Sequence, residues 1–217
     1  MINIQDIILK VFSGAGATCL IFFSTIIFSL PLGLLITFAR MSKFKPLSIF
    51  AGALISILRG TPLMLQLIMW YFGPYYIFGV SFGLMWRVPA IIIGFSINYA
   101  AYFAEIYRGG IQSIPNGQYE AAAVLGYSKS QTFWKIIFPQ MVKRVIPPVT
   151  NEIITLVKDT SLAFVVAYTE MFTVAKQIAA AKTTIIPLFV AGVFYYIFNY
   201  LVAFIMEKIE LSFNYYK

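Results

Sequence analysis

The sequence predicts an all-α protein that crosses a membrane about five times. Of its 217 residues, 60% are hydrophobic and only 11% are charged, whereas a soluble domain carries roughly 25% charged residues. The apolar residues also gather in runs long enough to span a lipid bilayer. Together these observations exclude a soluble globular domain and a disordered chain.

The first apolar run, residues 11–39, has no charged side chain. A helix of that length would reach roughly 44 Å, which exceeds the ~30 Å hydrocarbon core of a bilayer. The run is far longer than the apolar core of a signal peptide, and Asp6 precedes it in place of a basic segment. We therefore expect a retained transmembrane helix. Its small residues, among them Thr18, Thr25 and Ser29, suit close helix packing.

Four further spans are expected at residues 49–78, 88–107, 146–168 and 183–206. The second should be broken at Gly60, Thr61 and Pro62, because Pro62 lacks an N–H and Gly60 has no side chain to hold helical geometry. The fourth should open at Pro147 and Pro148. An odd number of spans places the two termini on opposite sides of the membrane.

Lysine and arginine are concentrated on one side of these spans, at the first and third connections and in the C-terminal tail. That side holds ten of them: Arg40, Lys43, Lys45, Arg108, Lys129, Lys135, Lys143, Arg144, Lys208 and Lys217. The other side holds four: Lys10, Arg87, Lys176 and Lys182. Cytoplasmic loops are enriched in Lys and Arg, so we expect the N-terminus outside and the C-terminus in the cytoplasm. Topology then explains the net charge of +8, and no nucleic-acid partner is expected.

The longest stretch between spans, residues 109–144, is expected to carry two short helices at the cytoplasmic face. Ser113 and Pro115 suit the start of the first helix, and Gly126 suits its end. A second amphipathic stretch, residues 129–138, should stop at Pro139.

Seven positions of this stretch follow the EAA motif of permease subunits in ATP-binding-cassette (ABC) importers. The motif is Glu-Ala-Ala, three residues, Gly, nine residues, Ile, one residue and Leu-Pro; the residues here are Glu120, Ala121, Ala122, Gly126, Ile136, Phe138 (in place of Leu) and Pro139. Residues 59–62, 104–110 and 158–162 look like the corresponding motifs of the polar amino acid uptake subfamily. The chain thus resembles these permeases over residues 17–204.

The resemblance implies a type I ABC importer permease fold, with one transmembrane domain over residues 1–217 and a cytoplasmic coupling loop at residues 109–144. It implies that four loop residues contact an ATPase: Glu120, Ala121, Ala122 and Gly126. Small alanines let a helix sit close in a groove, and a glutamate offers its carboxylate to a basic partner. The alternative is an amphipathic connector resting on lipid headgroups, with Lys129, Lys135 and Lys143 facing phosphates.

Ionisable side chains inside spans are costly and are therefore functional candidates. In the fourth span Glu152, Thr155 and Asp159 lie on one helix face, because they are three and four residues apart. In the third span Asn98, Tyr102 and Glu105 are spaced in the same way, four and three residues apart. We expect both stripes to face one water-accessible cavity.

The expected break in the second span adds Arg59 and Thr61 to the candidate substrate-binding residues. A helix N-terminus and a guanidinium there would bind a carboxylate, and Glu152 and Asp159 would accept from an ammonium group. The motif at residues 158–162 adds Thr160 and Ser161. The alternative is a structural role, in which Arg59, Lys158, Glu152 and Asp159 form ion pairs that hold the bundle together.

The residue inventory excludes several chemistries for this chain. With no histidine and one cysteine, it has no His-based general base, no Cys/His zinc cluster and no internal disulfide. It also lacks the phosphate loop Gly-x-x-x-x-Gly-Lys-Ser/Thr. We therefore expect no enzyme activity, no metal and no cofactor in this chain, with ATP and Mg²⁺ bound by a partner ATPase.

The resemblance implies the transmembrane subunit of an ATP-driven importer of polar L-amino acids. The acidic excess inside the spans favours cationic ones: arginine, lysine or histidine. The resemblance implies four partners: a pair of ATPases, a second permease subunit (a second copy preferred over a related chain), an extracellular solute-binding protein and a prokaryotic cell membrane. Two alternatives remain: an ion-coupled secondary carrier with Glu105, Glu152 or Asp159 at its ion site, and a membrane scaffold.

Overall fold

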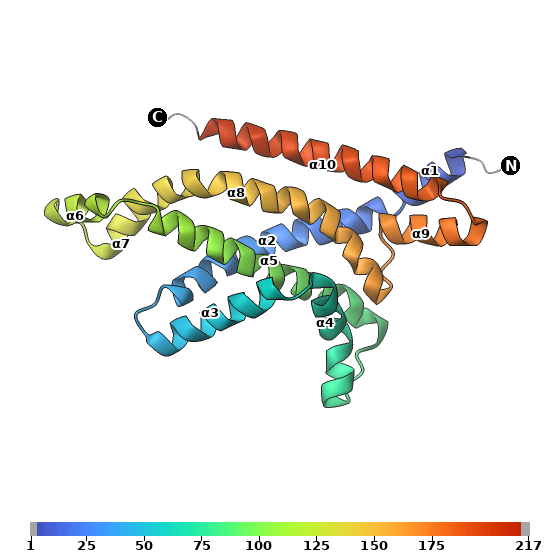
Figure 1. Ribbon diagram of the computed structural model, residues 1–217, viewed down its shortest axis with the longest axis horizontal. Coiled ribbons are helices and arrows are strands. Elements are labelled where there is room, and N and C mark those ends of the chain that lie inside the picture. The colour runs from blue at the N-terminus through green and yellow to red at the C-terminus, as the bar shows by residue number, and fades with distance from the viewer. Residues whose placement is uncertain (1–3, 214–217) are drawn as a thin grey trace.

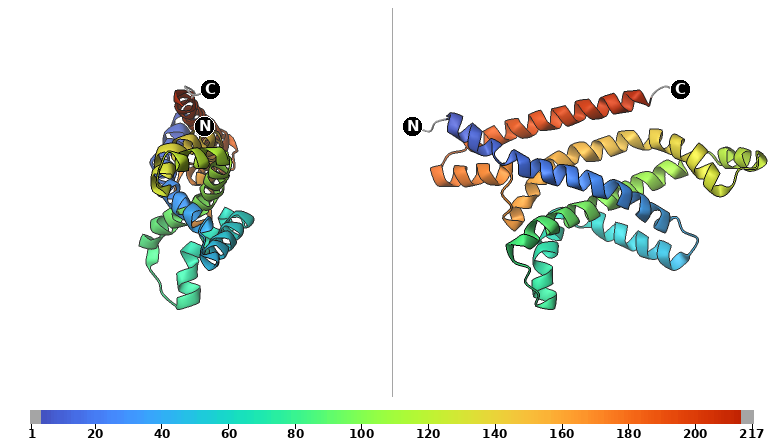
Figure 2. Two further views of the ribbon diagram at one scale, coloured as in Figure 1. Left: turned by 90° about the vertical axis from the view of Figure 1, so that its left-hand side faces the viewer. Right: turned by 180° about the vertical axis from the view of Figure 1, so that it is seen from behind.

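The computed structural model describes residues 4–213, and within that range every regular element is helical. The four longest helices lie along the long axis of the molecule (Figures 1 and 2): α2 (Ala15–Arg40), α5 (Arg87–Gln112), α8 (Phe138–Asp159) and α10 (Ile186–Ser212). The start of α1 lies at one end of this axis, and α10 runs toward the other end (Figure 1). The all-α membrane fold expected from the sequence is confirmed.

Three helical stretches are long and apolar enough to cross a membrane, and five are if each of two bent helix pairs counts as one span. The first bent pair is α3 (Lys45–Gly60) with α4 (Leu63–Phe78), whose axes differ by 108°. The second joins the stretch Lys129–Val166 to α9 (Met171–Lys182), with a bend of 56°. This agrees with the five spans expected, and the break in the second span falls at Thr61 and Pro62, as predicted.

The first span is interrupted near its start, which the sequence does not reveal. Short helix α1 (Ile4–Phe12) is separated from α2 by Ser13 and Gly14. The break coincides with a close approach to α9: a Cβ on Gly14 would lie 2.6 Å from the backbone nitrogen of Met171. Only a glycine fits here without a shift of the backbone.

The fourth span differs from its expected form at both ends. Pro147 and Pro148 lie inside α8, not at its start, because membrane helices tolerate proline where neighbouring helices satisfy the freed carbonyls. At the other end α8 stops at Asp159, and a 3-10 helix, η3 (Thr160–Val166), leads to α9. The expected span over residues 146–168 therefore lies, up to Val166, within a longer helical stretch, Lys129–Val166, which changes to 3-10 geometry after Asp159.

The loop contains α6 (Asn116–Val124) and α7 (Lys129–Thr132), followed by the π-helical segment η2 (Phe133–Ile137), which continues into α8. The expectation that Pro139 ends a helix is wrong. Pro139 occupies the first turn of α8, where the missing N–H is tolerated because the wider π turn precedes it. Helices α6 and α7 project beyond the other helices at one end of the molecule (Figure 1).

Helix α5 is central, and its closest neighbour is α2. Along α2, Ser29, Gly33 and Thr37 are four residues apart and buried, which brings the two backbones together. The Thr37 hydroxyl donates to the carbonyl of Ala104 on α5 at 3.1 Å. Small residues therefore form this helix contact, as expected for the first span.

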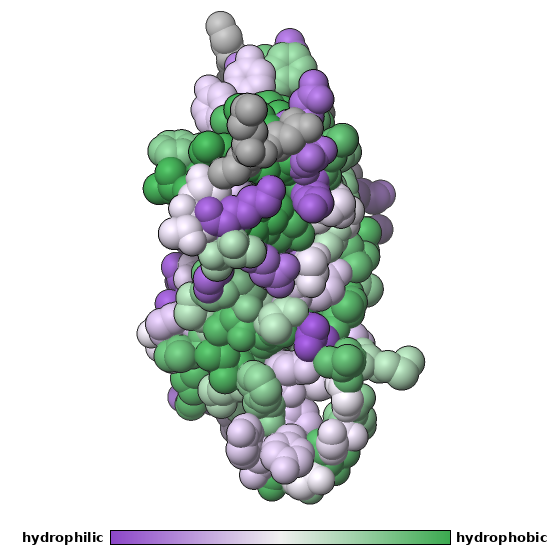
Figure 3. Space-filling view, turned by 90° about the vertical axis from the view of Figure 1, so that its right-hand side faces the viewer, coloured by the Kyte–Doolittle hydropathy of each residue, from purple (hydrophilic) through white to green (hydrophobic). Residues whose placement is uncertain are grey.

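The remaining surface is strongly apolar. Only 11% of the most apolar window of α10 is buried within the chain, and large hydrophobic side chains are exposed along α4 and α10. Figure 3, which views the end that carries α1 and α9, shows hydrophilic residues scattered among hydrophobic ones. The exposed apolar surface of α4 and α10 suits contact with lipid or with another membrane helix.

Candidate functional site

The bend between α3 and α4 is fixed by two buried amides. Gln66 on α4 donates from Nε2 to the carbonyl of Leu58 and to the hydroxyl of Thr61, both at 2.8 Å. Asn98 on α5 donates from Nδ2 to the same Leu58 carbonyl and to Oε1 of Gln66, both at 3.1 Å. These bonds satisfy groups at the end of α3 that a broken helix leaves without intrahelical partners. Gln66 is not among the residues predicted from the sequence, although a buried amide four residues after a Pro break is a visible signal.

A polar cavity of about 450 Å³ lies at this bend, between α3, α4, α5, α8 and η3. Its lining includes seven of the nine residues expected to bind substrate: Arg59, Thr61, Asn98, Tyr102, Glu152, Thr155 and Asp159. The polar stripes of the third and fourth spans therefore face one space together with the broken second span. Such a volume is within the range of small-molecule sites.

The acidic side of the cavity is provided by α8. Glu152 and Asp159 are both half-buried and line the cavity. The hydroxyl of Tyr99 on α5 donates to Oδ2 of Asp159 at 2.7 Å, and Tyr99 is only 2% exposed. This hydrogen bond holds the carboxylate at the cavity wall. Tyr99 is not predicted from the sequence, although it directly follows Asn98.

The basic side of the cavity is provided by α3. The Arg59 guanidinium lies over the Tyr102 ring, 5.1 Å from its centroid, which is a cation–π contact. Next to it, Pro62 and Leu63 begin α4 and line the same cavity. The N-terminus of this helix adds partial positive charge. The two sides of the cavity therefore carry opposite charge.

The alternative of structural ion pairs is not found among the described residues. Within residues 4–213 the structure has one ion pair, between Arg108 and Glu105, with Nη2 and Oε2 2.6 Å apart. Arg59, Glu152 and Asp159 form no ion pair in that range, so these charges are left facing the cavity. Glu105, expected on the stripe of the third span, lies outside the cavity lining and bonds Arg108 instead.

Two expected substrate residues lie outside the cavity lining. The Thr160 hydroxyl is fully buried and donates to the Val157 carbonyl at 2.8 Å. The Ser161 hydroxyl donates to the Lys158 carbonyl at 2.7 Å. Both hydrogen bonds stabilise the transition from α8 into η3, directly after Asp159.

The EAA residues form a short helix and a tight turn. Glu120 and Ala121 are exposed on α6, whereas Ala122 is buried. Gly126 has φ +76°, and the N–H groups of Gly126 and Tyr127 donate to the carbonyls of Ala123 and Ala122, both at 3.0 Å. This is a Schellman ending, which favours glycine because of its left-handed conformation. The expected role of Gly126 in ending the helix is confirmed.

The start of α6 differs from the expectation. Pro115 is the N-cap residue and gives no side-chain cap. Ser113 instead follows α5, and its hydroxyl donates to the Gly110 carbonyl at 2.6 Å. Within this loop a side chain does cap the next helix: Ser128 forms a reciprocal capping box with Gln131 at the start of α7.

At the tip of α6 two apolar side chains face outward. Val124 is 88% exposed and Leu125 is 73% exposed, and both lie next to Gly126. Exposed apolar residues on a protruding helix mark a contact surface for another molecule. The sequence alone does not single them out, although they fall inside the variable positions of the motif.

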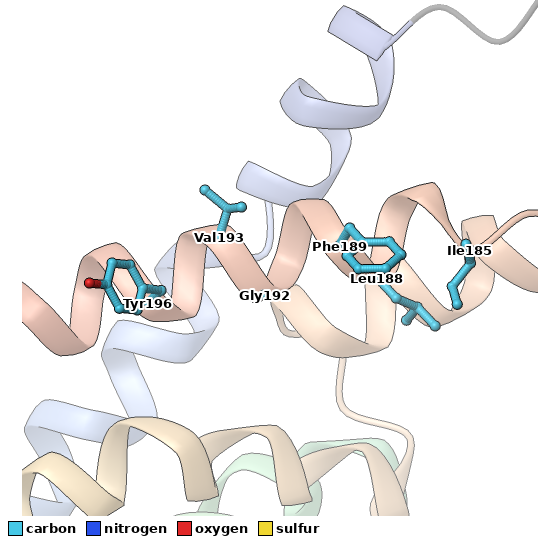
Figure 4. A pocket seen from close by; sticks show the side chains of 6 residues that line it. All are labelled: Ile185, Leu188, Phe189, Gly192, Val193 and Tyr196. Atoms are coloured by element: carbon cyan, nitrogen blue, oxygen red, sulfur yellow. The ribbon is translucent and has the colours of Figure 1, made fainter.

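A further cavity, of about 410 Å³, lies on the surface of α10 (Figure 4). One helix and its N-cap residue supply all the lining residues: Ile185, Leu188, Phe189, Gly192, Val193 and Tyr196. Apart from the Tyr196 hydroxyl, these side chains have no polar atoms. This groove therefore has the character of a lipid-facing or helix-facing surface and lacks the groups needed to bind a polar solute.

A helical membrane bundle with a charged cavity at a broken span and a protruding helix that carries the EAA residues has the parts of a transport permease. The chain belongs to the family described as binding-protein-dependent transport system inner membrane component, whose family model matches residues 7–214. It is an amino acid ABC transporter permease.

Several relatives support this assignment over nearly the full chain. A putative glutamine transport system permease protein of Rickettsia felis is 35% identical, over 97% of this chain and 95% of that protein. An arginine transport system permease protein of Bacillus subtilis is 34% identical, over 92% and 90%. An L-cystine transport system permease protein of Bacillus subtilis is 37% identical, over 85% and 78%.

Solved structures agree with the fold. The chain aligns with a structure described as an amino acid ABC transporter with histidines, with a TM-score of 0.87, 27% identity, and coverage of 98% of this chain and 99% of that one. An inward-facing methionine ABC transporter matches with a TM-score of 0.70 at 20% identity, over 97% and 94%, and this likeness concerns the fold alone. The type I importer fold implied by the EAA motif is thus confirmed.

Proposed function

We propose that this chain is the transmembrane subunit of an ATP-driven importer for cationic L-amino acids, with the cavity at the α3–α4 bend as the substrate site. The observation that carries the proposal is the charge of that cavity, where Glu152 and Asp159 face a single cation, Arg59. The backbone of a free amino acid has one carboxylate and one ammonium group. It therefore uses one cation and one anion of the site, and the second carboxylate is left for a positively charged side chain.

The proposed pose follows the charges of the cavity walls. The substrate carboxylate lies near Arg59 and Thr61, where the N-terminus of α4 adds to the attraction. The ammonium group and the cationic side chain face Glu152 and Asp159. Asn98, Tyr102 and Thr155 complete the lining and offer neutral hydrogen-bonding groups. Thr160 and Ser161 act indirectly, by fixing the turn that follows Asp159.

The proposed substrate class rests on the charges of the cavity, because the names of the relatives include amino acids of different charge. Their names include glutamine, which is uncharged, and arginine, which is cationic. Similarity of sequence at this level therefore supports an amino acid substrate, and the unpaired carboxylate of the cavity supports a cationic one. Membership of a binding-protein-dependent family does not favour the ion-coupled secondary carrier.

Coupling to ATP hydrolysis is assigned to α6. Its exposed Glu120 and the apolar tip at Val124 and Leu125 would fit a groove on a cytoplasmic ATPase, and the rigid turn at Gly126 would transmit movement between that groove and the bundle. In this proposal a pair of ATPases binds ATP and Mg²⁺, so this chain needs no cofactor and is not itself an enzyme.

The remaining partners and the orientation follow the same proposal. The turn between α2 and α3 lies at the same end of the molecule as α6 and α7 (Figure 1), and both segments are rich in Lys and Arg. This end is placed in the cytoplasm of a prokaryotic cell, with the N-terminus outside. A second copy of this chain completes the pathway, and an extracellular binding protein delivers the amino acid.

The test is uptake in proteoliposomes that contain the permease, its ATPase and the binding protein. With ATP inside and an ionophore present, labelled arginine should accumulate. Asp159→Asn should reduce arginine uptake several-fold more than glutamine uptake, because a single remaining carboxylate cannot pair with both the ammonium group and a cationic side chain. Glu207→Gln, at an exposed position of α10, is the matched control and should change neither. Accumulation that follows an ion gradient without ATP would overturn the importer, and equal losses for both amino acids in Asp159→Asn would overturn the cationic preference.

A further inference from the structure

A separate cavity of about 530 Å³ lies near α6 and α7, away from the substrate cavity. Its walls come from the end of α2, the end of α5 and the loop that carries α6. The residues used below are Phe38, Met41, Tyr119, Tyr127, Lys129 and Phe133, all of which line it. None of them lines the substrate cavity.

The interior of this cavity is apolar. The rings of Phe38 on α2 and Phe133 in η2 meet edge to face, with centroids 5.4 Å apart. Met41 follows directly after α2, and Tyr119 faces the same space from α6. A chain of methylene groups is the kind of ligand that such an interior favours.

The rim of the cavity is cationic. Lys129 forms part of the lining, and the Nζ atom of Lys135 lies 5.9 Å from the centroid of the Tyr127 ring, which also lines it. Neither lysine forms an ion pair within residues 4–213, where the structure has one pair, Glu105 with Arg108.

The surrounding sequence adds to this positive charge. Residues 40–48 contain three basic residues and no acid, and residues 109–144 contain one acid, Glu120. The rim is thus suited to an anionic group, and the interior to an apolar chain attached to that group.

The position of the cavity decides which anionic ligand fits it. It lies where α2 and α5 end, beside Trp134, which is 52% exposed and is of a type enriched at membrane interfaces. In the proposed orientation this level is the cytoplasmic leaflet, which carries anionic lipids, and basic pockets between helices on that side bind lipid headgroups.

We propose that this cavity binds an anionic phospholipid, with an acyl chain against Phe38, Met41 and Phe133 and the phosphate at Lys129 and Lys135. The lipid would contact both the end of the first span and the coupling helix, and so would help to hold α6 in place. The proposal rests on the proposed function for its orientation and for the presence of an ATPase.

The experiment is photolabelling of the full permease–ATPase complex in phosphatidylcholine nanodiscs. The probe is a trace of phosphatidylglycerol with a diazirine in its acyl chain, and the labelled peptides are identified by mass spectrometry. Label is expected on the segments around Phe38 and Phe133. Its yield should be at least about fivefold higher than with a phosphatidylcholine probe of the same acyl chain, because one nearby lysine usually strengthens the binding of an anionic headgroup by about this factor.

Three variants sharpen the test. Lys129→Glu should lower the label about fivefold or more, whereas Lys143→Glu, on α8 and outside the lining, should leave it unchanged. Met41→Trp keeps the charges but fills the cavity, and should also remove the label.

Several results would overturn the lipid site. Equal labelling by the two probes would show an apolar groove without headgroup selection, and persistent label in Met41→Trp would place the chain elsewhere. Label that appears only in the permease freed of its ATPase would assign the cavity to the ATPase. The readout is independent of transport. A complex that imports amino acids in proteoliposomes but takes no label in nanodiscs rejects the lipid site alone, and a complex that takes the label but imports none in proteoliposomes rejects the proposed function alone.

Discussion

The Tyr99 hydroxyl on α5 and the Asp159 carboxylate at the end of α8 are joined by a hydrogen bond of 2.7 Å. The donor is almost completely buried, and the acceptor lines the proposed substrate cavity. The bond therefore connects the central helix of the bundle to the point where the fourth span changes from α8 into η3. It fixes one oxygen of a carboxylate that the proposed function places against the substrate.

Removing this bond should weaken substrate binding. In Tyr99→Phe the ring stays and Asp159 loses its buried donor, at a cost of about 1 kcal/mol. We expect the KM for arginine uptake to rise about fivefold. Tyr107→Phe is the matched control, because Tyr107 is also buried on α5 and lies outside the cavity lining. Equal KM values for the two variants would argue against a role for the Tyr99–Asp159 bond.

The amide pair at the α3–α4 bend should matter for stability. Gln66→Leu keeps the side-chain volume but leaves the Leu58 carbonyl and the Asn98 amide with fewer partners. A loss of about 2 kcal/mol in the free energy of unfolding is expected, measured by thermal unfolding in detergent. Gln112→Leu, at an exposed position, should cost less than about 0.5 kcal/mol. A melting temperature for Gln66→Leu equal to that of the wild type would mean that these amides do not hold the bend.

The turn after α6 offers a test of coupling. A β-branched residue at Gly126, where φ is +76°, is strained by about 1–2 kcal/mol. Gly126→Val should therefore preserve the assembled complex but reduce the transport obtained per ATP hydrolysed. Gly117→Ala is the control, because Gly117 lies within α6 and a Cβ added there would extend into open space. Unchanged coupling in Gly126→Val would remove the turn from the mechanism.

Close packing of α2 on α5 should depend on Gly33. A Cβ there would lie 2.8 Å from Cβ of Phe103 and 3.1 Å from the carbonyl oxygen of Ala100. Gly33→Ala should destabilise the protein by about 1–3 kcal/mol through overpacking. Gly16→Ala, on the same helix but with open space around it, should be neutral or slightly stabilising. Similar unfolding temperatures for both variants would contradict the close helix contact.

Much of the architecture can be predicted because the length of each apolar run and the positions of the charged residues depend only on the local sequence. The break at Thr61 and Pro62 follows from proline chemistry, and the turn at Gly126 from the helix-ending preference of glycine. The shared cavity follows from the spacing of Glu152 and Asp159 on one helix face.

The errors have a common cause, which is the influence of tertiary packing on local propensity. Pro139 and Pro147 are helix breakers by sequence, yet they lie within α8 because a π-helical turn and neighbouring helices accommodate them. The break at Gly14 arises from contact with Met171, which is far away in the sequence. Tyr99 and Gln66 escape prediction because their importance comes from partners on other helices.

The most direct test of the central claim is equilibrium binding of labelled arginine to the purified permease–ATPase complex in nanodiscs, without the binding protein. If the cavity is the substrate site, binding should be saturable, lysine should displace arginine and glutamine should displace it poorly, and Asp159→Asn or Glu152→Gln should weaken binding at least several-fold. Arginine binding that is unaffected by both substitutions, or glutamine that competes as well as lysine, would contradict this assignment.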